Sequence, residues 1–235
     1  MTETNPPISP QIKKKVLHVG CSNKAIMEKF AGPEWQEVRL DIDPNAKPDI
    51  VASMVDLHMI ADNEFDAIWS AQNIEHLYAH EVTMALKEFY RVLKNGGGLF
   101  ATTPDLQTIC EYVVKGNLEG FLYQSNSGPI SPIDSIYGYR ASMAKGNLFM
   151  AHRMGFTVHT MANHLKTAGF SEIHVRRTDY DLAASAFKKL EIPPEQTKIH
   201  IIDKDYNRIM INRDNIDKEP ELKEGWQLNR APVEI

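Results

Sequence analysis

The stretch that decides the fold reads Val16-Leu17-His18-Val19-Gly20-Cys21-Ser22, a short apolar run that ends at a glycine. Short apolar runs bounded by a turn residue are typical of buried strands in parallel sheets. A glycine at such a turn lets the backbone approach a ligand closely, because no side chain stands in the way. We therefore expect a buried strand here, with a binding loop at its carboxyl end.

Helical patterns alternate with further strand-like segments along the chain. The clearest helix covers 79–93, where apolar residues share one face before Asn95-Gly96 supplies a stop. Such alternation indicates an α/β fold, a doubly wound and mostly parallel seven-stranded Rossmann-like sheet with helices on both faces. The remaining expected strands are 38–40, 50–52, 65–70, 98–102, 173–177 and 182–187. Further helices are expected after Ser22, from Thr103-Pro104 onward, and over 158–168.

The segment 116–155 breaks this periodicity and is rich in Gly, Ser, Pro, Asn and Tyr. It is too long for an ordinary connection, so we interpret it as a functional insertion or lid. The expected organisation is an arm at 1–14, one domain at 15–190 that contains this insertion, and a polar tail at 191–235.

Composition narrows the functional classes. The chain has 235 residues, 24% of them charged, and a net charge of -5. A mildly acidic balance disfavours broad binding to nucleic acid or to an anionic membrane, and no apolar run approaches the ~18 residues of a membrane span. The two cysteines, Cys21 and Cys110, form no zinc-spaced cluster. We therefore expect a cytoplasmic protein without a metal site.

Two residues point to a nucleoside ligand. Asp41 ends the second expected strand about twenty residues after Gly20, where a carboxylate can accept hydrogen bonds from both hydroxyls of a ribose. The positions after Gly20 lack the second and third glycines that a dinucleotide pyrophosphate needs. The loop therefore suits a nucleoside without phosphate, and nicotinamide-dependent redox chemistry is kept as an alternative.

These motifs, taken in order, resemble class I S-adenosylmethionine-dependent methyltransferases. The similar segments are 16–22, 39–44, Asp56-Leu57, 65–70, Glu75-His76-Leu77, 88–100, 153–156 and Gly169-Phe170, and together they span about Lys15 to Lys188. The resemblance implies S-adenosylmethionine as cofactor and methyl transfer to a small or medium-sized acceptor. It implies cofactor contacts from Gly20, Cys21, Ser22, Asp41, Ile42, Met54, Asp56, Leu57, Ser70, Ala71 and Gln72.

The sequence departs from the family pattern at three positions. His18 stands where the family often has an acid, Ser22 replaces a frequent glycine, and Ser53-Met54 replaces a frequent Asp-small pair. For this reason a non-catalytic nucleoside- or partner-binding module with the same fold is a third hypothesis.

Two histidines are candidates for catalysis, because a neutral imidazole can take a proton near pH 7. His76 follows the fourth expected strand, and His152 ends the insertion. The alternative interpretation of both is structural: a histidine at a helix start and one that fixes a loop. Tyr137, Tyr139 and Arg140, with Tyr123, are candidates for the acceptor pocket, or else they pack an ordered flap. The acceptor itself is not identified, and a homodimer is possible.

Overall fold

The computed structural model describes residues 13–190, 198–202, 208–212 and 227–229. Contacts within the chain divide it into two units, Met1–Lys189 and Leu190–Ile235. The second unit holds a three-stranded antiparallel sheet of order β11-β10-β12, built from β10 (Lys198–Ile202), β11 (Arg208–Asn212) and β12 (Gln227–Asn229). Nearly all of the predicted arm at 1–14 lies outside the described residues.

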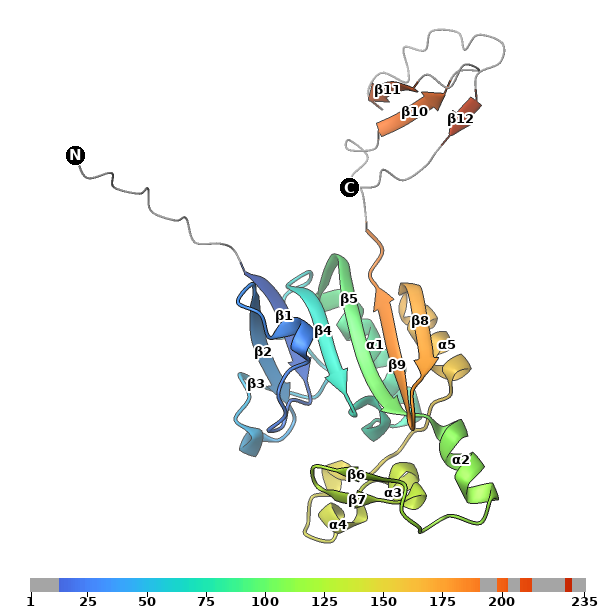
Figure 1. The fold of residues 1–235 in the computed structure, drawn as a ribbon. Coiled ribbons are helices and arrows are strands. Elements are labelled where there is room, and N and C mark those ends of the chain that lie inside the picture. The colour runs from blue at the N-terminus through green and yellow to red at the C-terminus, as the bar shows by residue number, and fades with distance from the viewer. Residues whose placement is uncertain (1–12, 191–197, 203–207, 213–226, 230–235) are drawn as a thin grey trace, which may run out of the picture. The chain divides into compact units, whose positions relative to one another are not determined.

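The first unit is built on a seven-stranded sheet of order β3-β2-β1-β4-β5-β9-β8 (Figure 1). Its strands match the seven that the sequence predicts, and only β9 runs antiparallel to its neighbours. The chain order reverses between β1 and β4, which makes their carboxyl ends the switch point where ligands bind on such sheets. The bounds are β1 (Lys14–Val19), β2 (Trp35–Asp41), β3 (Ile50–Val51), β4 (Phe65–Ala71), β5 (Leu93–Pro104), β8 (Ser171–Arg177) and β9 (Asp181–Phe187).

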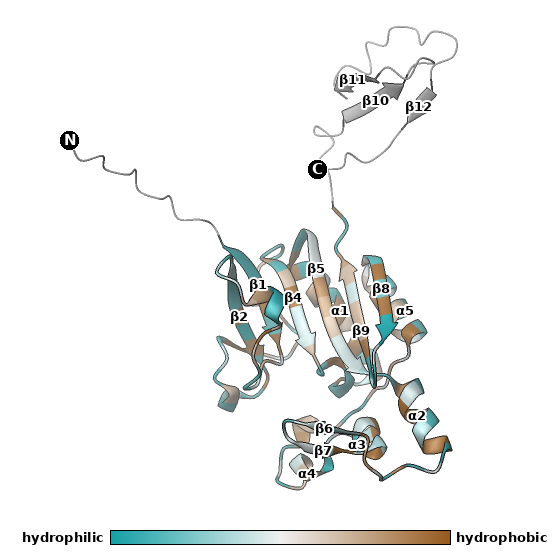
Figure 2. Cartoon of the chain, in the orientation of Figure 1, coloured by the Kyte–Doolittle hydropathy of each residue, from teal (hydrophilic) through white to brown (hydrophobic). Residues whose placement is uncertain are grey.

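Two α-helices cover one face of this sheet. Helix α1 (Ala79–Val92) and helix α5 (Val158–Ala168) contact each other and lie behind the sheet in Figure 1. Their apolar stripes face the strands (Figure 2), and Leu86 and Leu165 are buried in the same core as Leu17 of β1. This layer is as predicted.

The other face is covered differently from the expectation. Where a helix was expected after Ser22, the β1–β2 connection forms only a 3-10 helix, η1 (Glu28–Phe30). Ser22 has a left-handed backbone (φ +43°) and its N–H is bound by a side chain, so no α-helix begins there. Phe30 instead anchors this connection on Val16 and Ala67. Within the described residues, this connection therefore carries a 3-10 helix where the sequence predicted an α-helix.

Strand β5 also runs further than predicted. It pairs with β9 as far as Pro104, and Asp105 rather than Thr103 caps helix α2 (Leu106–Val114). The Asp105 carboxylate accepts a hydrogen bond from the N–H of Gln107, which satisfies a free donor of the first turn. Thr103 and Pro104, which the sequence predicted to begin the helix, therefore belong to strand β5 and pair with β9.

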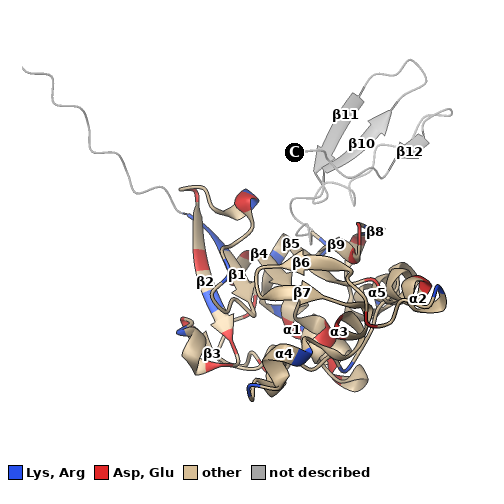
Figure 3. Ribbon diagram, turned by 60° about the horizontal axis from the view of Figure 1, so that its bottom comes forward, with Lys and Arg blue, Asp and Glu red and all other residues tan. Residues whose placement is uncertain are grey.

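The insertion folds as a small structure of its own next to the carboxyl ends of the parallel strands (Figures 1 and 3). Its end is tied to the fold, since the N–H groups of Arg153 and Met154 donate to the carbonyl of Glu75 at 2.8 and 3.1 Å. Among the described residues, no helix is long and apolar enough for a bilayer crossing. The insertion contains β6 (Tyr123–Ser125), β7 (Gly128–Ile130), α3 (Pro132–Tyr137), α4 (Arg140–Met143) and η4 (Leu148–Met150).

Candidate functional site

The turn after β1 requires a glycine. Gly20 has a φ of +60°, and a Cβ built on it would overlap the side-chain amide of Asn73. That amide is fixed, because its nitrogen donates to the Val19 carbonyl at 2.8 Å and to the Ser70 hydroxyl at 3.3 Å. The close approach links the ends of β1 and β4, which places the predicted loop at the switch point.

Asp41, at the end of β2, organises the backbone around this turn. Its side chain is buried, and its two oxygens accept hydrogen bonds from the N–H groups of Ser22 at 2.8 Å and Asp43 at 2.9 Å. A carboxylate offers about four lone-pair sites, so each oxygen keeps capacity for another donor. The predicted acid is therefore held at the strand end that faces the Gly20 loop.

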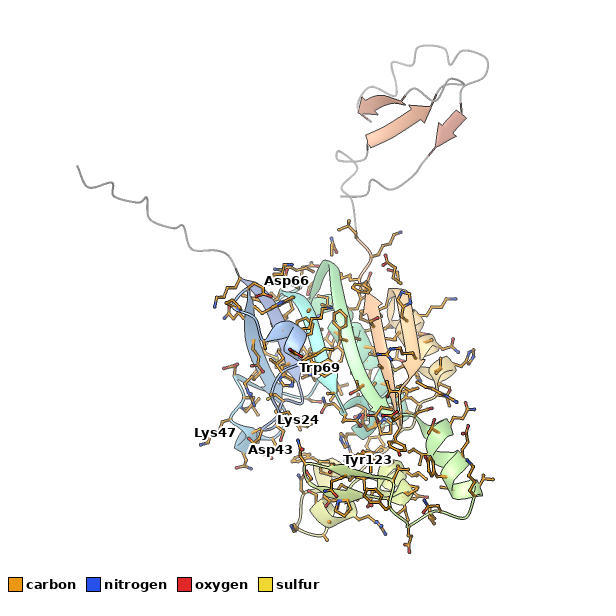
Figure 4. All side chains as sticks on the ribbon, viewed as in Figure 1. Lys24, Asp43, Lys47, Asp66, Trp69 and Tyr123 are labelled. Carbon is orange, nitrogen blue, oxygen red and sulfur yellow. The ribbon has the colours of Figure 1, made fainter. Side chains whose placement is uncertain are left out.

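Lys24 belongs to the same constellation and was not recognised from the sequence. Its ammonium crosses from the β1–β2 connection to the carbonyl of Ala71, 3.0 Å away at the end of β4 (Figure 4). The side chain is exposed, but desolvation near the strand ends lowers the pKa of Lys24, against the opposing charges of Glu75 and Asp41. A positive charge thus lies over the predicted cofactor loop.

The end of β4 turns sharply where three cofactor contacts were predicted. Ser70 is buried, Ala71 pairs with Thr102 of β5, and Gln72 adopts a left-handed φ of +58° while its N–H donates to the Thr102 carbonyl at 2.9 Å. This turn brings Ser70, Ala71 and Gln72 close to the Gly20 loop.

The residues predicted to contact adenine differ in how deeply they are buried. Ile42 is half exposed beside Asp41, and Met54 packs partly buried against the core. Asp56 is exposed and bonded to His58, whereas Leu57 is fully buried and its N–H donates to the Glu88 carboxylate at 2.9 Å. Leu57 thus anchors the segment after β3 in the core, and its role toward a cofactor stays a prediction.

Glu75, His76 and His152 meet at the border between the sheet and the insertion. Glu75 and His76 lie in the short helix η3 (Ile74–His76) that follows β4, and His152 lies at the end of the insertion. One donor atom from each of the three side chains lies within 4.8 Å of the others, and the two imidazole centroids are 4.9 Å apart. The structure therefore joins the two histidines that the sequence offered separately, and adds a carboxylate.

Backbone carbonyls orient both imidazoles. His76 Nδ1 is 3.1 Å from the Ala151 carbonyl, and His152 Nδ1 is 2.9 Å from the Ser135 carbonyl. Burial lowers the pKa of His76, opposed by hydrogen bonds to the backbone of Ala151 and Gln72, and lowers the pKa of His152, opposed by the charge of Glu75. Burial therefore favours the neutral form of both rings.

Glu75 is almost completely buried and only half satisfied. The Thr103 hydroxyl donates to Oε2 at 3.1 Å, while Oε1 has no hydrogen-bond partner among the described residues. Desolvation raises the pKa of this carboxyl, against the charge of His152 and the Thr103 bond. A buried carboxylate oxygen without a hydrogen-bond partner is unusual in a folded protein.

Two further polar side chains border the same strand ends. Tyr123 of β6 lies at the sheet end of the insertion (Figure 4), and burial, with the charges of Asp181 and Glu75, raises its pKa to about 12. Burial also raises the pKa of Asp181, opposed by a hydrogen bond from the Gln72 side chain. No local motif marks Asp181, because it is the antiparallel strand β9 that carries it to this edge.

The other predicted acceptor residues have partners within the insertion. The Tyr139 hydroxyl donates to the Ser127 carbonyl at 2.9 Å, and Arg140 Nε is 2.8 Å from the Asp134 carboxylate. Tyr137 is 62% exposed. These contacts hold the insertion together, and a role of the three residues in acceptor binding stays a prediction.

Comparisons with known proteins show which family and which fold this part of the chain resembles. Residues 17–101 match a family model described as a methyltransferase domain. That match covers β1 to most of β5, and so includes the Gly20 turn, Asp41 and Glu75-His76. A search of curated proteins found no match.

Solved structures with the same fold are distant in sequence. A S-adenosylmethionine-dependent methyltransferase from Methanosarcina mazei is 16% identical, with a TM-score of 0.51 over 76% of this chain and 94% of its own. One from Mesorhizobium loti is 18% identical, with a TM-score of 0.51 over 76% and 93%. One from Archaeoglobus fulgidus is 13% identical, with a TM-score of 0.51 over 76% and 87%. At this identity the likeness establishes the fold.

Proposed function

We propose, from the premise that residues 17–101 are a methyltransferase domain within a class I methyltransferase fold, that this chain transfers a methyl group from S-adenosylmethionine to a small or medium-sized acceptor. The observation that carries the proposal is the meeting of Gly20, Asp41 and the Ala71-Gln72 turn at the switch point of the sheet. All of these residues were predicted from the sequence to contact the same nucleoside ligand.

The cofactor fits the donors and acceptors of this edge. Asp41 supplies the acceptor for a ribose diol, and the backbone of the Gly20 turn would face the methionine end. Lys24 offers a positive charge to the carboxylate of that end, because its ammonium lies beside the same turn. No phosphate cradle is needed, which agrees with a loop that has one glycine where a dinucleotide site has three.

The acceptor belongs between the strand ends and the insertion. There an acceptor X–H attacks the methyl carbon in line, the C–S bond breaks, and its electron pair leaves on sulfur as S-adenosylhomocysteine. The proton of X–H must also leave, and a neutral ring of His76 or His152, at this border, can accept it. Insertion residues such as Tyr123 would then border the acceptor.

Calorimetry with S-adenosylmethionine and S-adenosylhomocysteine tests the binding half of the proposal. We expect saturable binding of both at one site, and no binding of NAD. Silence with both nucleosides would favour the non-catalytic module, and tight NAD binding would favour redox chemistry.

Methyl incorporation tests the other half. The chain is incubated with S-adenosylmethionine labelled in the methyl group and with fractionated metabolite pools, and labelled products are sought. We expect label in a fraction of small molecules. Binding of the cofactor without label in any fraction would contradict the assigned activity.

A further inference from the structure

We propose that Glu75, His76 and His152 form a binding site for a divalent first-row transition metal ion such as Zn²⁺, Fe²⁺ or Co²⁺. The three side chains come from two segments far apart in the sequence, η3 after β4 and the end of the insertion. The binding of the ion does not depend on the methyltransferase activity, whereas any role of the ion in methyl transfer rests on the proposed function.

The donor set suits such an ion. Two neutral imidazoles and one carboxylate are the ligands of many catalytic zinc sites and of non-haem iron sites. One donor atom from each residue lies within 4.8 Å of the others, so a modest inward movement of side chains brings all three into contact with one ion. Ions of this class accept four to six ligands, which leaves positions for water or an acceptor oxygen.

Glu75 shows independently that a partner is missing. The residue is 1% exposed, and its Oε1 has no hydrogen-bond partner among the described residues. An unsatisfied buried oxygen of this kind costs about 1–3 kcal/mol, and more when it is charged. A bound cation would satisfy that oxygen and compensate the charge that burial otherwise disfavours.

The contacts of the imidazoles have the form found around metal-binding histidines. A backbone carbonyl can only accept a hydrogen bond, so the carbonyls of Ala151 and Ser135 place the hydrogen of each neutral ring on Nδ1. On His152 the lone pair then lies on Nε2. The His76 ring is bonded to the backbone of both Ala151 and Gln72, so the orientation of each ring is fixed in advance. Histidine ligands of metals almost always make such a bond with their other nitrogen.

A small cavity adjoins the cluster. It measures about 10 Å³, and Glu75, His152, Leu106 and Met154 are among the residues that line it. This is about the space that one water molecule needs. The site therefore has room for a water molecule beside the ion.

The location gives the ion a function in the proposed reaction. The proposed function assigns Gln72 to the sulfonium end of the cofactor. Only Asn73 and Ile74 separate Gln72 from Glu75 in the sequence. An acceptor hydroxyl bound to the ion would lose its proton to solvent more readily, because a divalent cation lowers the pKa of a coordinated oxygen. The resulting oxygen is the nucleophile for in-line attack on the methyl carbon.

Cobalt titration of the full chain tests the site. The protein is first freed of metal with a chelator, and Co²⁺ is added while its visible d–d absorption is recorded. We expect one equivalent to bind and Zn²⁺ to displace it. His152→Ala and Glu75→Gln should weaken Co²⁺ binding by at least about tenfold, since even partners that only orient a ligand are worth that much.

His159→Ala is the matched control, because His159 is an exposed histidine on α5 outside the cluster. It should bind Co²⁺ as the wild type does. Equal Co²⁺ affinity in all variants, or no binding by the wild type, would overturn the proposal. S-adenosylhomocysteine binding, measured on the same samples, shows whether each variant is folded and tests the proposed function separately.

Crystals of the wild type soaked in Co²⁺ make the test independent of variant folding. An anomalous difference peak between Glu75, His76 and His152 is the expected result. A water molecule bonded to Glu75 in its place, with no anomalous signal, would refute the metal site even if the protein methylates its acceptor.

Discussion

At the scale of single residues, the cofactor site depends most on Asp41. We predict that Asp41→Asn raises the dissociation constant of S-adenosylhomocysteine about 10- to 100-fold, because the ribose loses a charged acceptor worth about 1.5–3 kcal/mol. Calorimetry measures the change. Asp43→Asn is the control, since Asp43 is a nearby carboxylate that caps the turn at Asn45 instead. Similar affinities for Asp41→Asn and the wild type would remove Asp41 from the site.

Lys24 permits a test of ligand orientation. Lys24→Met keeps the aliphatic stem and removes the charge, so we predict up to about fivefold weaker binding of S-adenosylhomocysteine. Binding of adenosine, which lacks the amino-acid end, should not change. Lys29→Met in the same connection is the control, because the Lys29 ammonium lies over the Phe100 ring, 3.8 Å from its centroid. An equal loss for adenosine would place Lys24 at the wrong end of the ligand.

Residue patterns located the Gly20 and Asp41 strand ends better than the border between the sheet and the insertion. Gly20 and Asp41 follow buried strands directly, so the sequence shows where they lie. Glu75 and His152 are brought together by the return of the insertion, and no local spacing records that contact. The expectation of no metal site rested on such spacing, and for that reason it overlooked this cluster.

At the scale of elements, the insertion is held by an ion pair between buried Asp134 and half-exposed Arg140. Asp134 accepts from Ser131 and Arg140, and although burial opposes it, these hydrogen bonds lower the pKa of Asp134 to about 2 from the ordinary 3.8. A lowered pKa in the folded state adds stability that is fully present above 3.8 and is lost as pH falls toward 2. The contribution is at most about 2 kcal/mol, since half-exposed Arg140 is partly screened.

Asp134→Asn should therefore destabilise the chain at neutral pH and make little difference near pH 2. Urea unfolding of the wild type and the variant across this range measures the difference. Glu119→Gln is the control, because Glu119 also contacts Arg140, at 3.4 Å, but is exposed. A destabilisation by Asp134→Asn that persists unchanged at low pH would show that packing, not charge, is responsible.

Element boundaries show where sequence reasoning reaches its limit. Apolar periodicity predicts the seven strands and helices α1 and α5. In each of them the pattern of apolar residues lies within one short segment of the sequence. Thr103-Pro104 has the pattern of a helix start, yet pairing with β9 extends the strand through both residues. The helix expected after Ser22 is absent because tertiary hydrogen bonds with Asp41 determine that backbone.

At the scale of the whole molecule, the first unit contains both a core and the complete candidate site. A hydrophobic core lies within Met1–Lys189, and so do Gly20, Asp41 and the Glu75 cluster. We predict that a chain ending at Leu190 folds and binds S-adenosylhomocysteine with unchanged affinity. Circular dichroism melting and calorimetry test this. A truncated chain that is insoluble, or that no longer binds, would assign the second unit a part in the site.

The thin cover over one face of the sheet has a consequence for dynamics. Residues 20–34 both present the Gly20 turn and shield Val16 and Ala67 through Phe30. A fluctuation that lifts this connection exposes the core and dismantles the ligand loop in a single event. Ligand binding at the Gly20 loop and protection of the β1 and β2 amides from deuterium exchange are therefore thermodynamically coupled. The more tightly a ligand binds, the less often the connection 20–34 opens.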